Sequence, residues 1–280
     1  MNKPLDDIGV LVTRAEHQQS DIVSMIENEG GTPYSIPLIK IDSPESWEDA
    51  DSAISEIDSY DWILFTSVNA VDGFIGRVKH TGKNISRLLP KKIAAVGSMT
   101  RKRLEDIGLK VSLQPIKYDG DNLLKSFGKE NIYEKRILFP GAEYGRERLI
   151  DGLINIGAMV ISVPVYRTIP NDNVDSNKLI SFLEDGVIQI ATFFSPSTFK
   201  VFLNHLPLEV TESTINKSVA IAVIGSTTSK YVNGLGFNID IVPEEHTVFG
   251  LIEAMKSWVQ SSGVIENNQK RLKLSDTLNE

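Results

Sequence analysis

An internal duplication limits what this chain can fold into more than any other feature of its sequence. Residues 10–41 read VLVTRAEHQQSDIVSMIENEGGTPYSIPLIKI, and residues 137–168 follow the same pattern 127 positions later. The residues that match at this offset are Leu11 and Leu138, Ala15 and Ala142, Glu16 and Glu143, Gly30 and Gly157, and Pro37 and Pro164. Each copy predicts a short apolar strand, a turn, an amphipathic helix that ends at a glycine, and a strand that contains a proline.

The duplication continues beyond these segments at an offset of 128 positions. The matches there are Phe65 and Phe193, Ser67 and Ser195, Phe74 and Phe202, Gly97 and Gly225, Ser98 and Ser226, Thr100 and Thr228, Gly108 and Gly236, Pro115 and Pro243, and Leu123 and Leu251. A nearly constant offset over about 115 residues indicates two copies of one structural unit. Because each copy alternates short strands with helices, we predict an α/β protein with two similar doubly wound parallel sheets and five strands per copy.

Length, composition and charge restrict the class of protein. A chain of 280 residues exceeds the usual size of one domain, so we expect two domains. No apolar run approaches the roughly 20 residues needed to cross a bilayer, and the start, MNKPLDDIG, lacks the pattern of a signal peptide; we therefore expect a cytoplasmic protein. The absence of cysteine excludes disulfides, thiolate nucleophiles and cysteine-ligated metals. A net charge of −8 argues against a nucleic-acid surface, and an anionic ligand would need local positive potential.

The two copies differ at one position that carries chemistry. The first copy has Ile39 where the second has Tyr166, so a hydroxyl-bearing ring breaks the symmetry of the duplicated scaffold. This makes Tyr166 a candidate for catalysis. Half-buried tyrosines are also common on strands, so a purely structural role is the alternative interpretation.

Small hydroxyl residues and glycines gather where each predicted strand passes into the next helix. These junctions are Thr13 with Arg14, Thr66 with Ser67, residues 97–100, residues 195–198 and residues 225–228. In doubly wound sheets the ligand crevice lies at the carboxyl ends of the strands. Free amides at helix starts, together with the helix dipole, form anion sites there. The junctions thus predict a site for an anionic ligand, with ordinary helix capping as the alternative.

Other common site patterns are absent. The four histidines, His17, His80, His205 and His246, have no metal-like spacing, so we expect no metal site. The nucleotide-binding patterns GxxxxGK[ST] and GxGxxG do not occur. Arg146 and Arg148 stand at a predicted helix start, where arginines are more often solvated than bound to a ligand.

Taken in order, several stretches resemble the uroporphyrinogen-III synthase family. They are VLVTRAE, DWILFTSVNAV, AAVGSMTRKRLEDIGLKV, VPVYRT, TFFSPSTFKVF and AVIGSTTSKYVNGLGF, and the resemblance covers residues 9–258. It implies a cyclising hydro-lyase of tetrapyrrole (porphyrin and haem) biosynthesis that needs no metal or organic cofactor. Such an enzyme converts hydroxymethylbilane into uroporphyrinogen III, with inversion of the last pyrrole ring (ring D) and loss of water.

The resemblance also implies a particular domain organisation. Residues 1–35 would join residues 171–264 in one flavodoxin-like α/β domain, and residues 42–164 would form the other. Residues 36–41 and 163–170 would be the connecting strands. We expect the polar tail at 265–280 to be a frayed helix end or disordered.

Site residues and partners follow from the same resemblance. Tyr166 would face the interdomain cleft and help the leaving hydroxyl depart. The residues expected to bind the eight carboxylates of the substrate, mostly through backbone amides, are Thr13, Arg14, Ser67, Gly97, Thr100, Ser195, Ser197, Gly225 and Thr228. The expected partner is the small molecule hydroxymethylbilane, and we expect no nucleic acid or membrane partner. We also expect a monomeric protein that makes a transient contact with hydroxymethylbilane synthase. A non-catalytic bilobed sensor of tetrapyrroles or other anions is the alternative.

Overall fold

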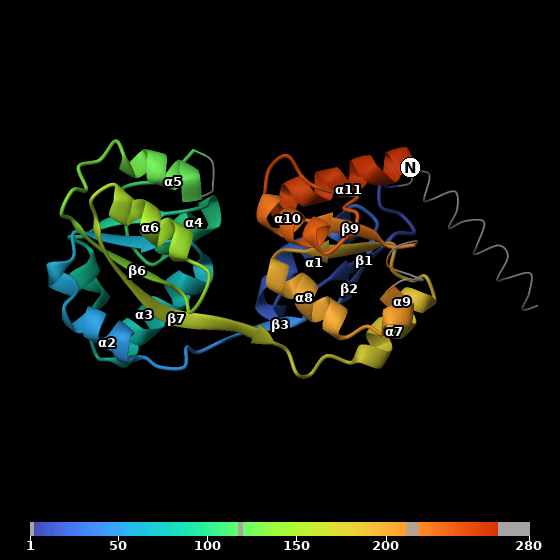
Figure 1. Ribbon diagram of the computed structural model, residues 1–280, viewed down its shortest axis with the longest axis horizontal. Coiled ribbons are helices and arrows are strands. Elements are labelled where there is room, and N and C mark those ends of the chain that lie inside the picture. Colours follow the sequence, from blue (N-terminus) through green and yellow to red (C-terminus); the bar gives the residue numbers. More distant parts are fainter. Residues whose placement is uncertain (1–2, 117–119, 212–214, 216–217, 263–280) are drawn as a thin grey trace, which may run out of the picture. The chain divides into compact units, whose positions relative to one another are not determined.

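The computed structural model describes residues 3–116, 120–211, 215 and 218–262. The chain divides into two compact units, each built on one sheet (Figure 1). Unit 1 is Met1–Lys40 with Pro170–Glu280, and unit 2 is Ile41–Ile169. The polar tail predicted at 265–280 lies outside the described residues.

Unit 1 contains a four-stranded sheet in the order β2-β1-β8-β9, and all neighbouring strands are parallel. The strands are β1 (Gly9–Val12), β2 (Thr32–Ser35), β8 (Ile190–Phe193) and β9 (Ala220–Val223). The α-helices are α1 (Ser20–Asn28), α7 (Ser176–Glu184), α8 (Pro196–Asn204), α9 (Leu208–Val210), α10 (Ser226–Gly234) and α11 (Val248–Ser262), and a 3₁₀ turn covers Glu16–Gln18.

Helices cover both faces of this sheet because its strands are apolar on both sides. Leu11 and Phe193 pack toward α7, α8 and α10, whereas Val10, Val12 and Ile190 pack toward α1 and α11. Successive strand residues therefore alternate between two cores, as expected for a parallel sheet that is buried on both faces.

Unit 2 contains a five-stranded sheet in the order β3-β7-β6-β4-β5. The strands are β3 (Ile39–Asp42), β4 (Trp62–Phe65), β5 (Lys92–Ala95), β6 (Arg136–Ala142) and β7 (Met159–Pro170). The helices are α2 (Glu48–Ser55), α3 (Val68–His80), α4 (Ser98–Asp106), α5 (Gly120–Phe127) and α6 (Glu147–Asn155), with 3₁₀ turns at Ile57–Ser59 and Ile85–Leu88. Its two cores separate in the same way, with α2, α3 and α4 on one face and α5 and α6 on the other.

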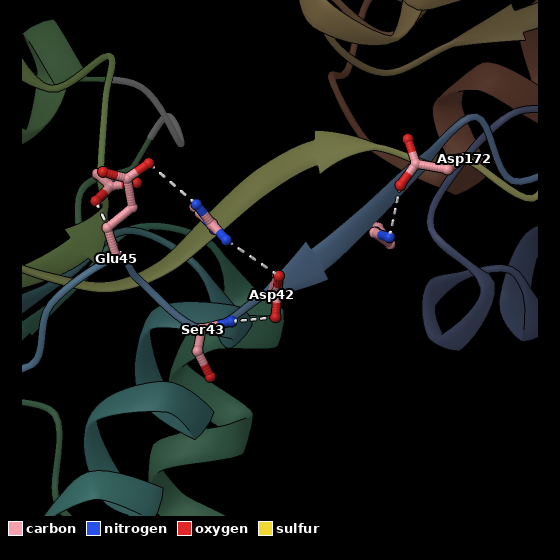
Figure 2. Close-up of polar contacts among 7 residues, drawn as sticks. Asp42, Ser43, Glu45 and Asp172 are labelled. Carbon is pink, nitrogen blue, oxygen red and sulfur yellow. Dashed lines mark hydrogen bonds and ion pairs between the residues drawn. The ribbon is translucent and has the colours of Figure 1, made fainter.

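The edge strand β3 is antiparallel to its neighbour β7, whereas β7, β6, β4 and β5 are parallel to one another. The amide of Asn171 donates to the carbonyl of Leu38 at 3.0 Å, and Arg167 pairs with Asp42 at 3.4 Å. Residue numbers thus rise along β3 as they fall along β7, and the strand arrows in Figure 2 point in opposite directions.

Charged contacts accompany this pair of strands (Figure 2). The guanidinium of Arg167 also reaches Glu45 at 3.1 Å, and Lys40 reaches Asp172 at 3.1 Å. Arg167 therefore links β7 both to β3 and to the segment that follows β3.

Both sheets combine strands from the two sequence copies. The sheet of unit 1 takes β1 and β2 from the first copy and β8 and β9 from the second, and the sheet of unit 2 takes the remaining strands. This exchange arises because the chain passes from one unit to the other within β3 and returns within β7.

The expectation of five strands per copy is wrong for the second copy. The first copy contributes β1 to β5, but the second contributes only β6 to β9 among the described residues. The difference arises at residues 36–38, where the first copy is interrupted and the second continues as β7. Residues 36–38 separate β2, which lies in the sheet of unit 1, from β3, which lies in the sheet of unit 2, so the two cannot form one continuous strand of a single sheet. Ile36 and Leu38 bury their side chains in the core of unit 1.

Candidate functional site

A one-residue bulge in β7 orients Tyr166. Along the β6 and β7 pair, Gly141 lies opposite Pro164, and the next residue, Ala142, lies opposite Tyr166, so Val165 is extra. Val163 and Val165 are buried in the core beneath α3, and the ring of Tyr166 packs against the same core. Regular alternation would turn a residue next to Val165 toward the opposite face. The bulge therefore lets Tyr166 face the α3 side of the sheet.

The phenol of Tyr166 meets the start of helix α3. Its oxygen lies 3.2 Å from the hydroxyl oxygen of Ser67, which caps α3 by accepting from the amide of Ala70 at 3.1 Å. Helix α3 can approach β7 closely because residue 73 is glycine: a Cβ there would lie 2.4 Å from the carbonyl oxygen of Val165. Tyr166 and Ser67 are both candidate residues from the sequence, and the fold brings them together.

Arg146 departs from the expectation of a solvated side chain. It is half-buried, and its Nη1 donates to the carbonyls of Phe139 at 3.0 Å and Val163 at 3.3 Å. Its guanidinium also stacks 5.2 Å from the centre of the Phe139 ring. Burial lowers the pKa of Arg146, while the electrostatic effects of Tyr166 and Glu147 act in the opposite direction. Arg148 does follow the expectation, since 84% of its side chain is exposed and it pairs with Asp121.

The burial of Arg146 could not be predicted from its own position in the sequence, because it depends on the lack of a side chain at Gly141. A Cβ on Gly141 would lie 2.8 Å from both Cδ and Nη1 of Arg146. Glycine at this position therefore leaves room for the guanidinium at the end of β6. The first glycine of GAEYGRER, Gly141, is a signal in the sequence that a side chain is excluded there, but only the pairing of β6 with β7 shows what it accommodates.

The remaining predicted residues of unit 2, Gly97 and Thr100, follow β5. Gly97 occupies the N-cap of α4 with φ near +88°, a backbone conformation that favours glycine. It has no side chain with which to cap the helix, so the first amides of α4 receive no side-chain cap. Thr100, in the first turn of α4, is buried. The open amides are the feature of this junction that suits an anion.

In unit 1 the two predicted residues after β1, Thr13 and Arg14, differ in their surroundings: the first has a structural role and the second carries a charge. The hydroxyl of Thr13 is fully buried and donates to the carbonyl of Thr192 at 2.5 Å, so it links β1 to β8. Arg14 is half-buried, its guanidinium lies 4.6 Å from the centre of the Phe194 ring, and burial lowers its pKa. Arg14 thus resembles Arg146 in its surroundings.

The junctions after β8 and β9 repeat those of unit 2. Ser195 caps α8 by accepting from the amide of Thr198 at 3.2 Å, as Ser67 caps α3, and its hydroxyl lies 2.9 Å from that of Ser197. Gly225 stands at the N-cap of α10 without a side-chain cap, as Gly97 does for α4, and Thr228 is buried. The duplication thus predicted equivalent junctions correctly: one serine cap and one glycine start in each unit.

Strand order decides which junctions are neighbours. Strands β1, β8 and β9 are adjacent in unit 1, so their three junctions follow one another along one edge of the sheet. In unit 2, β7, β6, β4 and β5 are adjacent, which aligns Tyr166, Arg146, Ser67 and Gly97 along the corresponding edge. Capping accounts for the two serines but leaves the glycine starts open, so the capping interpretation explains only part of the pattern.

A groove of about 620 Å³ elsewhere in unit 1 contains none of the predicted site residues. Helix α11 forms much of it, with Phe249 and Trp258 among its apolar lining residues. Its carboxylates, Asp240, Glu244, Glu245 and Glu253, would repel an anionic ligand. The groove is therefore a poor candidate for the anion site.

The described ranges hold neither a candidate metal site nor a candidate membrane span. No group of three or more histidine, aspartate or glutamate side chains is arranged to hold a metal ion there. No helix in the same ranges is long and apolar enough to cross a membrane.

This chain is similar in sequence and in fold to known uroporphyrinogen-III synthases. A family model described as uroporphyrinogen-III synthase HemD matches residues 20–253. A uroporphyrinogen-III synthase of Synechococcus elongatus is 30% identical over 263 residues, covering 93% of this chain and 98% of that protein. One of Chlorobaculum parvum is 28% identical over 236 residues, covering 84% and 92%. A crystal structure of a mutant uroporphyrinogen III synthase from Thermus thermophilus aligns with a TM-score of 0.60 at 17% identity over 90% of this chain and 99% of that one, so the fold is shared.

Proposed function

Because this chain belongs to the uroporphyrinogen-III synthase family, we propose that Tyr166 is the acid that starts its cyclisation of hydroxymethylbilane. The enzyme is a cyclising lyase of tetrapyrrole biosynthesis, and its product is uroporphyrinogen III, in which ring D is inverted. The observation that carries the role of Tyr166 is the 3.2 Å separation between its phenol oxygen and the hydroxyl oxygen of Ser67.

The hydrogen bonds around Ser67 leave the phenol proton available. The oxygen of Ser67 already accepts from the amide of Ala70, and its single proton can be donated to the phenol oxygen of Tyr166. In that arrangement the phenol proton can be donated to the hydroxyl that leaves the substrate. The same Ser67 donor then stabilises the negative charge that develops on the phenol oxygen.

Loss of this hydroxyl as water leaves an azafulvene cation at the hydroxymethyl end of the bilane. The substituted carbon of the last pyrrole ring, at the other end, attacks the cationic carbon and forms a spiro intermediate, which fragments and recloses with that ring inverted. An unguided bilane closes without inversion. The enzyme must therefore hold one folded conformation of its substrate, and positioning contributes more than any single acid.

The junction residues are proposed to supply that positioning. Substrate carboxylates would accept from helix-start amides at Gly97 and Gly225 and would contact Ser67, Ser195, Ser197 and Arg14. Thr13, Thr100 and Thr228 are buried, so their contribution would come from backbone amides and from holding the junctions in shape. This proposal is supported by the uncapped glycine starts. It is also supported by Arg14, which is half-buried and forms no ion pair with a carboxylate among the described residues, although Asp21 acts on it electrostatically.

The organisation of the molecule is part of the same proposal. Units 1 and 2 would act as domains, and the paired β3 and β7 would be their connection. We further propose a cytoplasmic monomer that receives its substrate through a transient contact with hydroxymethylbilane synthase. Sedimentation of the purified protein, alone and with that synthase, measures the oligomeric state and the contact.

The deciding experiment supplies purified protein with freshly generated hydroxymethylbilane, oxidises the products and separates the type I and type III uroporphyrin isomers. Predominantly type III product, formed more slowly by Tyr166→Phe, is the expected result. Type I isomer alone from folded protein would contradict the proposal and would favour the sensor, which binds a tetrapyrrole without closing it.

A further inference from the structure

The two sequence copies place one arginine each at the same strand-to-helix junction, but at different positions. At the 127-residue offset, Arg14 aligns with Gly141 and Gln19 aligns with Arg146. The offset holds in the fold, since α1 (Ser20–Asn28) and α6 (Glu147–Asn155) occupy matching residues. The arginine thus precedes the helix by several residues in one copy and directly in the other.

These two arginines differ from all others in the part of the chain that the structure describes. Every other arginine there forms an ion pair with a carboxylate: Arg77, Arg87, Arg101, Arg103, Arg136, Arg148 and Arg167. Arg14 and Arg146 instead contact uncharged oxygens and stack on a phenylalanine ring. Both are half-buried as well.

A half-buried cation without an ion-paired carboxylate has lost hydration, and the nearby charges, Asp21 for Arg14 and Glu147 for Arg146, offset that loss only in part. The carbonyls of Phe139 and Val163 offset part of this loss for Arg146, and they hold its Nη1 in place. That leaves Nε and Nη2 as donors with the geometry that suits a carboxylate. In a chain with a net charge of −8, such a cation is a selective point of attraction for an anion.

We propose that Arg146 binds a carboxylate of the substrate beside Tyr166, as the counterpart in unit 2 of Arg14 in unit 1. The proposal rests on the substrate assignment made above, but it does not depend on the catalytic role of Tyr166. It gives unit 2 a fixed positive charge at the end of β6, next to the strand that carries the phenol. Arg146 is therefore a binding residue, which contributes to substrate affinity rather than to the chemical step.

Three variants test this role through steady-state kinetics with freshly generated hydroxymethylbilane. Arg146→Gln is expected to raise KM about ten- to hundredfold while kcat stays within about threefold, since a hydrogen bond to a charged group is lost. Arg146→Lys keeps the charge but not the planar fork, so its KM should be intermediate. Arg148→Gln is the matched control. It removes the same charge at a position two residues from Arg146, where the arginine forms an exposed ion pair with Asp121, and its KM should be that of the wild type.

The salt dependence of kcat/KM separates binding from structure. Raising ionic strength should lower kcat/KM less steeply in Arg146→Gln than in Arg148→Gln, because one charge attraction is missing. A folded Arg146→Gln with the KM and salt dependence of Arg148→Gln would overturn the proposal. If Arg146→Gln does not fold, Gly141→Ala, which displaces the same side chain, decides in its place: an unchanged KM overturns the proposal and a raised KM supports it.

Tyr166→Phe, measured alongside, distinguishes this proposal from the catalytic one. A lowered kcat in Tyr166→Phe with an unchanged KM in Arg146→Gln would support Tyr166 as the acid and reject Arg146 as a binding residue. A raised KM in Arg146→Gln with wild-type kcat in Tyr166→Phe would support Arg146 as a binding residue and reject Tyr166 as the acid.

Discussion

The phenol oxygen of Tyr166 lies 3.2 Å from the hydroxyl oxygen of Ser67, and the bulge at Val165 is what brings the two residues together. Ser67 is also the N-cap of α3, so one hydroxyl both starts a helix and contacts the candidate acid. The orientation of the phenol thus depends on the start of α3 as well as on β7.

Tyr166→Phe should lower kcat about ten- to hundredfold and leave KM nearly unchanged, because it removes a proton donor and little volume. Initial rates of type III isomer formation measure the effect. Tyr133→Phe removes a hydroxyl from a side chain that is largely exposed, and it should behave as the wild type. Wild-type kcat in Tyr166→Phe would eliminate the phenol as the acid.

Ser67→Ala should reduce both stability and turnover. Loss of the N-cap bond to Ala70 lowers the free energy of unfolding by about 1 kcal/mol, which urea denaturation measures. Asp175→Ala removes an equivalent cap, a 3.0 Å bond to the amide of Lys178 on α7, and should lower stability by a similar amount. Only Ser67→Ala should also lower kcat. Equal kcat in the two variants would mean that Ser67 is only a cap.

Gly141→Ala should raise KM without removing any charge. Its Cβ would lie 2.8 Å from Cδ and Nη1 of Arg146, so that side chain must move. Gly76→Ala is the matched control, because no atom lies within 4 Å of a Cβ there and alanine in the middle of α3 should raise stability by about 0.5–1 kcal/mol. A wild-type KM in both would show that Arg146 does not need its present position.

Asp51 and Arg77 predict a pH dependence of stability in unit 2. Arg77 donates from Nε and Nη2 to the two carboxylate oxygens, both at 2.6 Å, and these bonds hold the pKa of Asp51 below its ordinary value. The folded carboxylate therefore binds a proton more weakly than the unfolded one. Its contribution is present above the unfolded pKa of about 3.9 and is lost as the pH falls through the lower folded pKa.

The measurement compares Asp51→Asn with wild type in urea at several pH values. Because 39% of the Asp51 side chain is exposed, solvent screening keeps the expected loss at neutral pH below about 1 kcal/mol. The difference between the two proteins should shrink as the pH falls below about 4. Asp49→Asn lies on the same helix and has no ion-paired arginine among the described residues, so it should show no such trend. A constant difference for Asp51→Asn would refute the assignment.

Much of the fold could be predicted because it depends on local patterns. Gly30 and Gly157 end helices α1 and α6 with φ near +90° and +93°, as the repeated glycine predicted. Apolar strands on both faces required helices on both sides, and strand-to-helix junctions required caps or glycine starts. These requirements act over a few residues, so they can be read without knowing which strands become neighbours.

The sequence by itself determined the duplicated α/β scaffold, the equivalent junctions and the choice of Tyr166 as the residue that breaks the symmetry. The repeat itself left open whether each sheet mixes strands of both copies, which the family resemblance implied and the tertiary structure shows. Only the tertiary structure decided that a bulge turns Tyr166 toward Ser67, and that Gly141 makes room for a half-buried Arg146. The physical reason is distance along the chain. Strand pairing and side-chain burial join residues that periodicity treats as independent, and a tandem repeat looks the same whether or not its halves exchange strands.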